Sequence, residues 1–250
     1  MIPCHAAVAL CACLSSAFGQ TMSEVTVFEG GRDGYHTYRI PAILRAADGA
    51  LLAFCEGRTH NAADTGDIDI VLRRSTDEGR SWGPLILVVD NGPHTAGNAS
   101  PILDRRTGRI VLLFNQNFVQ DNQTAIQNGT STATRSAWVC YSDDHGLSWS
   151  QPLEITDQVK RPDWRWLAFG PAHGIQLARG PHAGRLLVGA VQNGPNSNGA
   201  FGVFSDDTTH DDLGNDQDLL IGAFNAATNR QFVGDIDRIH IHGTATVLRK

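Results

Sequence analysis

Ser75-Thr76-Asp77-Glu78-Gly79-Arg80-Ser81-Trp82 decides the fold, because its pattern, Ser-x-Asp-x-Gly-x-x-Trp, returns later in the chain. The second copy, Ser142-Asp143-Asp144-His145-Gly146-Leu147-Ser148-Trp149, begins 67 residues after the first. Each copy follows a strand-like run, Ile68–Arg74 or Ala137–Tyr141. Asp and Ser side chains can bond turn amides, Gly supplies a positive φ, and Trp packs the hairpin against its neighbour. A repeat of this period, built from strands, predicts a β-propeller.

Two further sequence patterns recur in the chain: a short apolar run, and then a Gly-containing turn that leads into a longer apolar run. They precede both boxes, and a weaker copy occurs later without a complete box. The copies are Pro41–Leu44 with Asp48–Phe54, Pro101–Leu103 with Thr107–Phe114, and a weaker third, Gly174–Leu177 with Ala183–Val188. The longer runs are continuous and not alternating, as expected for inner strands buried on both faces. The sequence therefore predicts three blades.

The length of the chain limits how many blades it can hold. At roughly 60 residues per blade, 250 residues hold about four, whereas a closed propeller has typically 4–8. We therefore expect an all-β, incomplete propeller with about three recognisable blades over residues 24–207. Residues 208–250 form an atypical tail, in which Phe232–His242 faintly resembles the last strands of laminin-G or concanavalin-like lectin modules.

Residues 1–19 have the pattern of a secretory signal peptide. Ala6–Leu14 is apolar, and Ala17-Phe18-Gly19 is a small-x-small cleavage site. The segment before the apolar stretch has no Lys or Arg, so an ordinary apolar N-terminus is the alternative. The pattern predicts a secreted or periplasmic protein. No apolar stretch in the sequence is long enough to span a bilayer, so we expect no transmembrane segment.

The cysteines and the net charge exclude several kinds of site. Three of the five cysteines fall in the leader, and Cys55 and Cys140 each lie inside a predicted strand. Export would permit a disulfide between these two, but buried free thiols are the expected state. No Cys/His spacing suggests zinc, so we expect neither a metal nor a cofactor. The net charge of −6 and the absence of a basic run argue against nucleic acid as a partner.

Polar residues follow the apolar strand of each blade at the same place. They are Glu56-Gly57-Arg58, Asn115-Gln116-Asn117 and Gln192-Asn193. If the blades are equivalent, these groups share one rim of the ring, where loops on a rigid scaffold concentrate binding residues. Arg39 begins the first inner strand and is expected to converge with Arg58 near the axis.

Two convergent guanidinium groups indicate an anionic ligand, most simply a carboxylate. The alternative is that Arg39 and Arg58 pair with local acids such as Glu56 or Asp64. Asp64 lies in the long loop Thr59–Asp67, and a carboxyl group in a loop above a cleft is a candidate general acid. The alternative for Asp64 is an ordinary turn-forming role.

These motifs together resemble the bacterial sialidases (neuraminidases) from about Val25 to Asp207. The resemblance rests on the two Asp boxes and four other stretches: Tyr38-Arg39-Ile40-Pro41, Glu56-Gly57-Arg58, Asp64–Ser75 and Gly170–Leu177. The Asp box alone is weakly specific. The Arg-Ile-Pro phrase, followed by the second Arg and the Asp-x-Gly-Asp loop in that order, is strongly specific.

The resemblance implies a six-bladed propeller and an exo-α-sialidase, a glycoside hydrolase that releases terminal sialic acid from sialylated glycans with retention. Arg39 would be the first member of an arginine triad that grips the substrate carboxylate, and Arg58 would lie near that carboxylate. Asp64 would be the general acid/base. The resemblance also implies substrate-facing positions at Asn98, Pro171 and His173.

The chain departs from the sialidase pattern at the nucleophile. Sialidases use a Tyr nucleophile, and a neutral Tyr suits a substrate whose own carboxylate would repel an anion. None of the three tyrosines, Tyr35, Tyr38 and Tyr141, lies in the nucleophile's context, and its Glu partner is not found either. The rival hypothesis is therefore a non-catalytic propeller fragment that binds a sugar or a protein.

Overall fold

The computed structural model describes residues 24–170, 172–195, 197–205 and 220–224, and these residues form two sheets, of eight and five strands, that divide into three antiparallel blades. Blade 1 consists of β1 (Thr37–Arg45), β2 (Leu51–Arg58), β3 (Ile68–Ser75) and β4 (Ile86–Val89). Blade 2 consists of β5 (Thr95–Leu103), β6 (Ile110–Asn117), β7 (Ser136–Ser142) and β8 (Leu153–Glu154). Blade 3 consists of β9 (Trp166–Phe169), β10 (Ile175–Gln176), β11 (Leu186–Gly194), β12 (Ser197–Phe204) and β13 (Leu220–Phe224). The helices are α1 (Gln123–Asn128) and α2 (Thr156–Val159). The predicted signal peptide and Pro171 lie outside the described residues.

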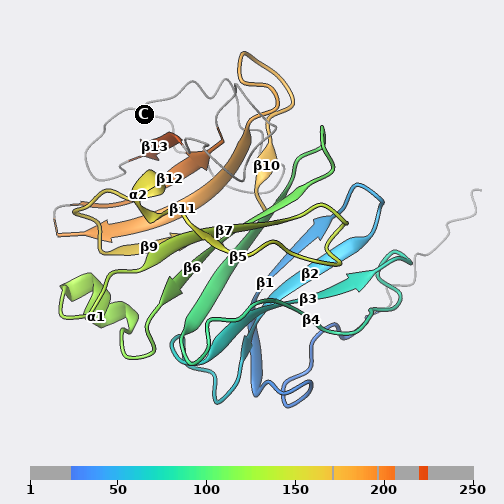
Figure 1. The fold of residues 1–250 in the computed structure, drawn as a ribbon, viewed down its shortest axis with the longest axis horizontal. Helices are drawn as coiled ribbons and strands as arrows, with labels where there is room; N and C mark the ends of the chain where they lie inside the picture. The colour runs from blue at the N-terminus through green and yellow to red at the C-terminus, as the bar shows by residue number, and fades with distance from the viewer. Residues whose placement is uncertain (1–23, 171, 196, 206–219, 225–250) are drawn as a thin grey trace, which may run out of the picture.

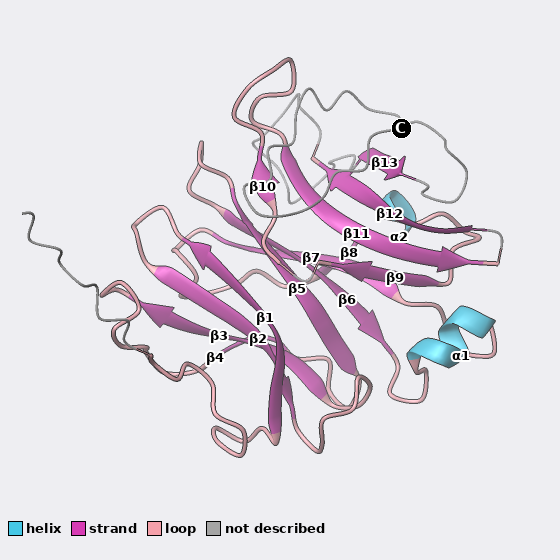
Figure 2. Ribbon diagram, turned by 180° about the vertical axis from the view of Figure 1, so that it is seen from behind, coloured by secondary structure: helices cyan, strands magenta, loops and turns pink. Residues whose placement is uncertain are grey.

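The strands of each blade follow one another as antiparallel neighbours, and the three blades stand side by side (Figures 1 and 2). A single parallel pair, Ile68 with Thr95, joins blade 1 to blade 2. In blade 3, β9 and β10 both pair with β11, so they are two halves of one interrupted first strand. β13 lies within the predicted tail and pairs with β12 as the last strand of this blade. The described residues are thus three blades of a propeller that does not close among them.

The core lies between the blades, which explains the continuous apolar runs. In β2 and β6 nearly every residue is buried, on both faces of the sheet. Between blades 1 and 2, Phe54, Leu112 and Phe114 are completely buried. Between blades 2 and 3, Leu167 and Phe169 are completely buried. Among the described strands, β6 contributes to both interfaces, with Leu112 and Phe114 in one and Val111 and Leu113 in the other.

The two Asp boxes form the turns from β3 to β4 and from β7 to β8. In the first, Asp77 accepts hydrogen bonds from the hydroxyl and main-chain N–H groups of Ser81, and Ser75 Oγ accepts one from Gly79 N. Ser75 pairs with Leu51, at the end of blade 1 opposite to the pair formed by Arg58 and Ile68. The boxes therefore lie at the ends of the blades away from the arginines.

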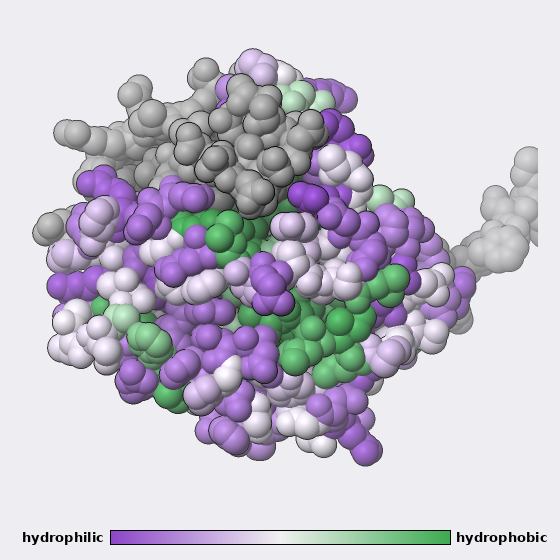
Figure 3. Space-filling view, in the orientation of Figure 1, coloured by the Kyte–Doolittle hydropathy of each residue, from purple (hydrophilic) through white to green (hydrophobic). Residues whose placement is uncertain are grey.

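Other sequence predictions concern the cysteines and the surface. Cys55 and Cys140 are buried free thiols, which confirms the expected state. Apolar surface gathers over blade 1 in Figure 3, and on β1 the Ile43 side chain is exposed. No helix among the described residues is long and apolar enough to cross a membrane.

Candidate active site

The first strand of each blade has the same irregularity at the same level. The pairing of β1 with β2 shifts between Arg39 and Ala42, and the pairing of β5 with β6 shifts between Gly97 and Ser100. At equivalent positions the backbone is left-handed, with φ of 56° at Ile40, 58° at Asn98 and 53° at Gly170. A left-handed β-branched residue such as Ile40 is a strained outlier, and such strain and β-bulges concentrate at functional sites. The bulges therefore mark one end of the blades as the candidate site.

Arg39, Arg58 and Asp64 meet at this end. Arg39 Nη1 lies 2.7 Å from Asp64 Oδ1, and Arg58 Nη1 lies 2.8 Å from the same oxygen. The two guanidinium groups also share the carbonyl oxygen of Ala62 as an acceptor. Two guanidinium groups that converge on one carboxylate oxygen are an arrangement able to bind a carboxylate, and here that carboxylate is Asp64.

A buried ion pair with Glu56 holds Arg58 in place. Arg58 is 2% exposed and Glu56 is 3% exposed. Arg58 Nη2 and Nε donate to Glu56 Oε2 over 2.6 and 3.2 Å. A buried charge is tolerated when it is paired and its remaining atoms are hydrogen-bonded. Glu56 binds the Nε/Nη2 edge of the Arg58 guanidinium, and Nη1 points toward the Asp64 loop.

β5, the first strand of blade 2, binds the other carboxylate oxygen of Glu56. Asn98 N donates to Glu56 Oε1 over 2.9 Å. A Cβ atom on Gly97 would lie 2.4 Å from the same oxygen, so only glycine permits this close approach. The bulge in β5 therefore shapes the site in blade 1.

The two arginines hold the pKa of Asp64 below its ordinary value. Desolvation is the largest single influence and raises this pKa, but hydrogen bonds and charge from Arg58 and Arg39 together outweigh it. The Asp64 side chain is 67% exposed and the Arg39 side chain 43% exposed, so this pair is open to solvent. In this arrangement Asp64 is an anion, and it has to leave the arginines before it can act as an acid.

Both sequence hypotheses about the arginines therefore describe part of the site. Arg39 and Arg58 converge as the carboxylate hypothesis expects, and they pair with the local acids Glu56 and Asp64 as the alternative expects. The buried Glu56 is a permanent partner of Arg58. The exposed Asp64 pairs with both arginines at once.

Of the other predicted substrate positions, Asn98 is engaged within the protein. Its Nδ2 donates to the carbonyl oxygen of Phe169 and its Oδ1 accepts from Arg135 Nη2. His173 is exposed on blade 3 and lines a cavity of about 320 Å³ with Gly170, Val188 and Phe201. The structure thus brings Asn98 to the arginines through Glu56, whereas His173 lies along a separate cavity in blade 3.

Arg135 is a residue that the sequence reasoning missed. It precedes β7, is 3% exposed, and donates to Asn98 Oδ1, Asn117 Oδ1 and the carbonyl oxygen of Leu167. Its partners come from three strands of two blades, so no local sequence motif identifies it.

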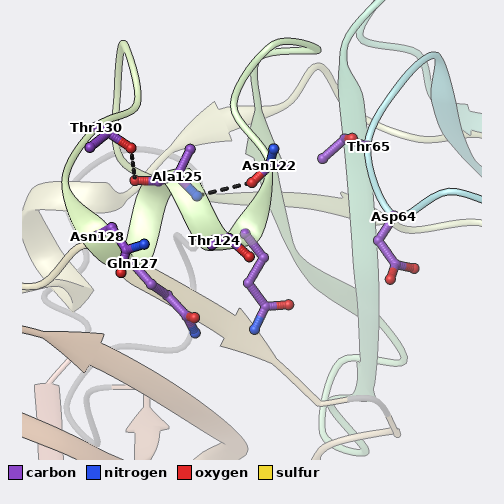
Figure 4. A pocket seen from close by; sticks show the side chains of 9 residues that line it. Asp64, Thr65, Asn122, Thr124, Ala125, Gln127, Asn128 and Thr130 are labelled. Carbon is purple, nitrogen blue, oxygen red and sulfur yellow. Dashed lines mark hydrogen bonds between the residues drawn. The ribbon is translucent and has the colours of Figure 1, made fainter.

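A polar cavity of about 600 Å³ extends from Asp64 and Thr65 to α1 (Figure 4). The helix is capped by Asn122, which accepts from Ala125 N, and by Gly129 with φ of 72°. The cavity wall is rich in side-chain amides and hydroxyls, from Asn122, Gln123, Thr124, Gln127, Asn128 and Thr130. Such a wall offers donors and acceptors to a hydroxylated ligand that reaches past Asp64.

Residues 49–219 match the family of BNR repeat-like domains. The chain belongs to the sialidase family of BNR-repeat proteins. It is similar to an exo-alpha-sialidase of Arthroderma benhamiae, with 37% identity over 66% of this chain and 44% of that protein. It is also similar to a sialidase of Micromonospora viridifaciens, with 38% identity over 74% of this chain and 30% of that protein. The chain therefore spans less than half the length of these curated relatives.

Solved structures agree with this membership. The Hadza microbial sialidase Hz136 superposes with a TM-score of 0.65 and 27% identity, over 76% of this chain and 38% of that one. A leech intramolecular trans-sialidase has a TM-score of 0.62 over 82% of this chain and 46% of that one, and at 17% identity it supports the fold alone. The fold is thus part of a sialidase β-propeller.

Within this sialidase fold, none of the three tyrosines is placed as a nucleophile. Tyr35 donates to Asp69 Oδ2, and burial together with this hydrogen bond raises the Tyr35 pKa far above its ordinary value. Tyr38 donates to the carbonyl oxygen of Arg32. The Tyr141 ring lies under the Arg109 guanidinium, and Arg109 bonds Asp143 of the second Asp box. Among the described residues, Arg39, Arg58 and Asp64 therefore come together, and each of the three tyrosines has another partner.

Proposed function

We propose that this chain carries the carboxylate-binding and acid/base half of an exo-α-sialidase site, in a glycoside hydrolase that acts on terminal sialic acid of glycans. The observation that carries the proposal is the convergence of Arg39 and Arg58 on one oxygen of Asp64. Sialic acid is distinguished from neutral sugars by its carboxylate, and a pair of guanidinium groups recognises that group by charge and geometry together. The names of the relatives support the same activity.

Substrate binding would exchange one carboxylate for another. The substrate carboxylate takes the place of Asp64 on Arg39 and Arg58, and Asp64 is released into the opening of the site. Away from the arginines, Asp64 loses the two positive charges that lower its pKa. It can then take up a proton and donate it to the glycosidic oxygen as the bond between the sugar and the leaving group breaks. Binding of the correct substrate thus prepares the acid.

The cavity beside Asp64 suits the hydroxylated parts of a sialylated glycan. Gln127 and Asn128 present amide groups from α1 across the cavity from Asp64 (Figure 4). We therefore expect glycoproteins, glycolipids or oligosaccharides as substrates. The leader-like residues 1–19 support a secreted or periplasmic location, where such glycans are accessible. Cell fractionation with an antibody against the chain tests this location, and retention in the cytoplasm contradicts it.

The missing nucleophile supports a second candidate, a non-catalytic sialoside-binding propeller. A retaining mechanism needs a nucleophile on the face of the sugar opposite the acid. General acid catalysis alone contributes typically 10²–10⁴-fold, well below the 10⁶–10¹⁷-fold usual for enzymes. We therefore expect the 250-residue chain to hydrolyse a chromogenic sialoside poorly or not at all.

The test measures binding and turnover separately. Calorimetry with free sialic acid should detect binding to the purified chain, and Asp64→Ala should tighten it because the competing carboxylate is gone. The same variant should abolish any turnover of a chromogenic sialoside. Unchanged affinity in Asp64→Ala contradicts the carboxylate exchange. Robust turnover that disappears in Asp64→Ala would instead place the nucleophile within this chain.

A further inference from the structure

Arg135 is a buried cation in the seam between blades 2 and 3. Its Nη2 donates to Asn98 Oδ1 over 2.9 Å, and its Nε donates to Asn117 Oδ1 over 3.2 Å. Its Nη1 donates to the carbonyl oxygen of Leu167 over 3.4 Å, and its guanidinium carbon lies 4.3 Å from the centre of the Trp166 ring. The guanidinium is therefore held on every edge and on one face.

The acceptors around Arg135 are uncharged. In the described part of the chain its hydrogen bonds go to two side-chain amides and a main-chain carbonyl. Burial lowers its pKa to about 10, and the charges of Glu56 and Asp64 act in the opposite direction, so Arg135 is a cation at neutral pH. A buried charge without a direct counter-ion is costly, and an apolar side chain would pack the seam at a lower cost. The stability of the seam therefore does not explain why a charged residue stands at position 135.

Four contacts connect Arg135 to the ligand-facing groups. Arg135 holds the side chain of Asn98, and the main-chain N–H of Asn98 holds Glu56 Oε1. Glu56 Oε2 holds Arg58, and Arg58 Nη1 reaches Asp64. The left-handed backbone of Asn98, with φ of 58°, points its side chain and its N–H to these different partners. Arg135 is therefore linked to Asp64 through blade 2 without touching it.

We propose that Arg135 is a positioning residue for the carboxylate site, because it fixes Asn98 and through Asn98 the orientation of Glu56 and Arg58. This inference rests on the proposed function for its ligand. The charges of the connected groups agree with it. Arg39, Arg58 and Arg135 carry three positive charges, and Glu56 and Asp64 carry two negative charges, which leaves one positive charge for one ligand carboxylate.

Lys160 supports the segment that carries Arg135. Its ammonium donates to the carbonyl oxygen of Arg135 over 2.7 Å and to Thr134 Oγ1 over 2.5 Å. The main chain at Arg135 is thus held as firmly as the side chain, as a positioning role requires.

The first experiment needs no ligand. Arginine Nε–Hε NMR spectra are recorded for the full chain, with the Arg58 signal assigned by its loss in Arg58→Lys. Arg135→Met keeps much of the side-chain length and removes every donor, so the Arg58 signal should shift or broaden. Arg109→Met is the matched control, because Arg109 also stacks on an aromatic ring, 4.2 Å from the Tyr141 centre, and lies at the Asp-box end. An unchanged Arg58 signal in folded Arg135→Met would overturn the proposal.

The second experiment measures affinity for free sialic acid by calorimetry. Arg135→Met should weaken binding by about tenfold, which corresponds to the loss of about one good interaction. Arg109→Met should stay within about twofold, as substitutions away from a site usually do. If the wild-type chain shows no affinity, the proposed function fails while the NMR result still decides the positioning role. Equal affinity in wild type and Arg135→Met contradicts the link between Arg135 and the ligand.

Asn98→Gly keeps the proposal testable if Arg135→Met does not fold. Glycine accepts the left-handed backbone at this position, so the substitution removes the amide without backbone strain. It should reproduce the change of the Arg58 signal, and adding Arg135→Lys should produce little further change, because both substitutions interrupt the same path. Fully additive effects of the two substitutions would contradict the path through Asn98.

Discussion

The two Asp boxes repeat their side chains and their geometry together, whereas the three left-handed positions at the other end of the blades repeat only their backbone. The Ser hydroxyl donates to the Asp Oδ1 over 2.8 Å in both boxes, and the fourth residue after the Asp donates its N–H over 2.9 Å in both. The left-handed residues, in contrast, are Ile40, Asn98 and Gly170. Blades 1 and 2 have the same turn at one end, whereas each of the polar groups at the other end occurs in one blade only.

The difference follows from what each end contacts. A box satisfies the hydrogen bonds of its own turn, so the same local sequence serves in both blades. The bulged strands β1 and β5 instead contribute different groups at the other end. Arg39 next to Ile40 contacts Asp64, whereas Gly97 next to Asn98 makes room for Glu56. The repeated strands and boxes thus form the structural frame, and the residues that differ between blades form the candidate site.

The largest expected effect is at the end of the blades that holds Arg39, Arg58 and Asp64, which we call the inner end. Arg58→Met removes the partner of the buried Glu56 and should lower the free energy of unfolding by about 3–5 kcal/mol, because it leaves a buried charge uncompensated. Urea unfolding followed by tryptophan fluorescence measures this change. Arg45→Met is the control, since the Arg45–Glu78 pair is exposed and should contribute little. A loss of similar size in both variants would remove the distinction between the two pairs.

Sequence reasoning predicted the frame well because the frame is repeated. The boxes, the buried inner strands and the three blades follow from patterns that occur two or three times. The proximity of Arg39, Arg58 and Asp64 could be predicted because the three residues stand in a recognisable order. The strain at Ile40 gave no signal, because a β-branched residue ordinarily favours extended backbone.

Two further features of the site were missed for different reasons. Arg135 could not be found, because its role depends on Asn98, Asn117 and Leu167, which come from three strands. The helix α1 had a signal that was overlooked, since Asn122 and Gly129 are typical cap residues at helical spacing.

Arg39→Lys sharpens the comparison at the ligand itself. Lysine keeps the charge but loses the planar fork, so affinity for sialic acid should fall by about 1.5–3 kcal/mol, the range of one hydrogen bond to a charged group. Thermal stability should change little, because the Arg39 side chain is exposed. Calorimetry gives the affinity, and the same titration on Arg74→Lys, near the Asp boxes, should match wild type. Equal affinity of Arg39→Lys and wild type would exclude a bidentate carboxylate contact.

Ser142→Ala and Ser75→Ala test whether the two boxes are equivalent in energy as well as in geometry. Each substitution leaves a glycine N–H without its acceptor, which costs about 1–3 kcal/mol when that group is buried. Gly146 of the second box packs against Leu52 and Leu72, so Ser142→Ala should be the more destabilising. Neither variant should alter affinity for sialic acid. A larger loss in Ser75→Ala would show that the seam between blades 1 and 2 does not depend on the second box.

The smallest expected effect is the acid dependence of the boxes. Hydrogen bonds from Ser81 and Ser75 lower the Asp77 pKa from 3.8 to about 2. At Asp144 desolvation is the largest influence and acts upward, but hydrogen bonds from Ser148, Ser142 and Leu147 still lower the pKa to about 2. Because the folded state binds protons less readily than the unfolded chain, this stabilisation is fully present above pH 3.8. It is lost as the pH falls toward 2.

The matching experiment follows the melting temperature of wild type and of the double variant Asp77→Asn/Asp144→Asn through this range of pH. The double variant should have a lower melting temperature at neutral pH and a flatter decline in acid. Asp64→Asn is the comparison at the inner end, because the Asp64 pKa is also lowered, by Arg58 and Arg39 against an opposing desolvation. Its exposed ion pairs should contribute less to the acid slope than the two boxes do. If Asp64→Asn flattens the curve more than the double variant does, the inner carboxylate is held more tightly than a displaceable stand-in for the substrate should be.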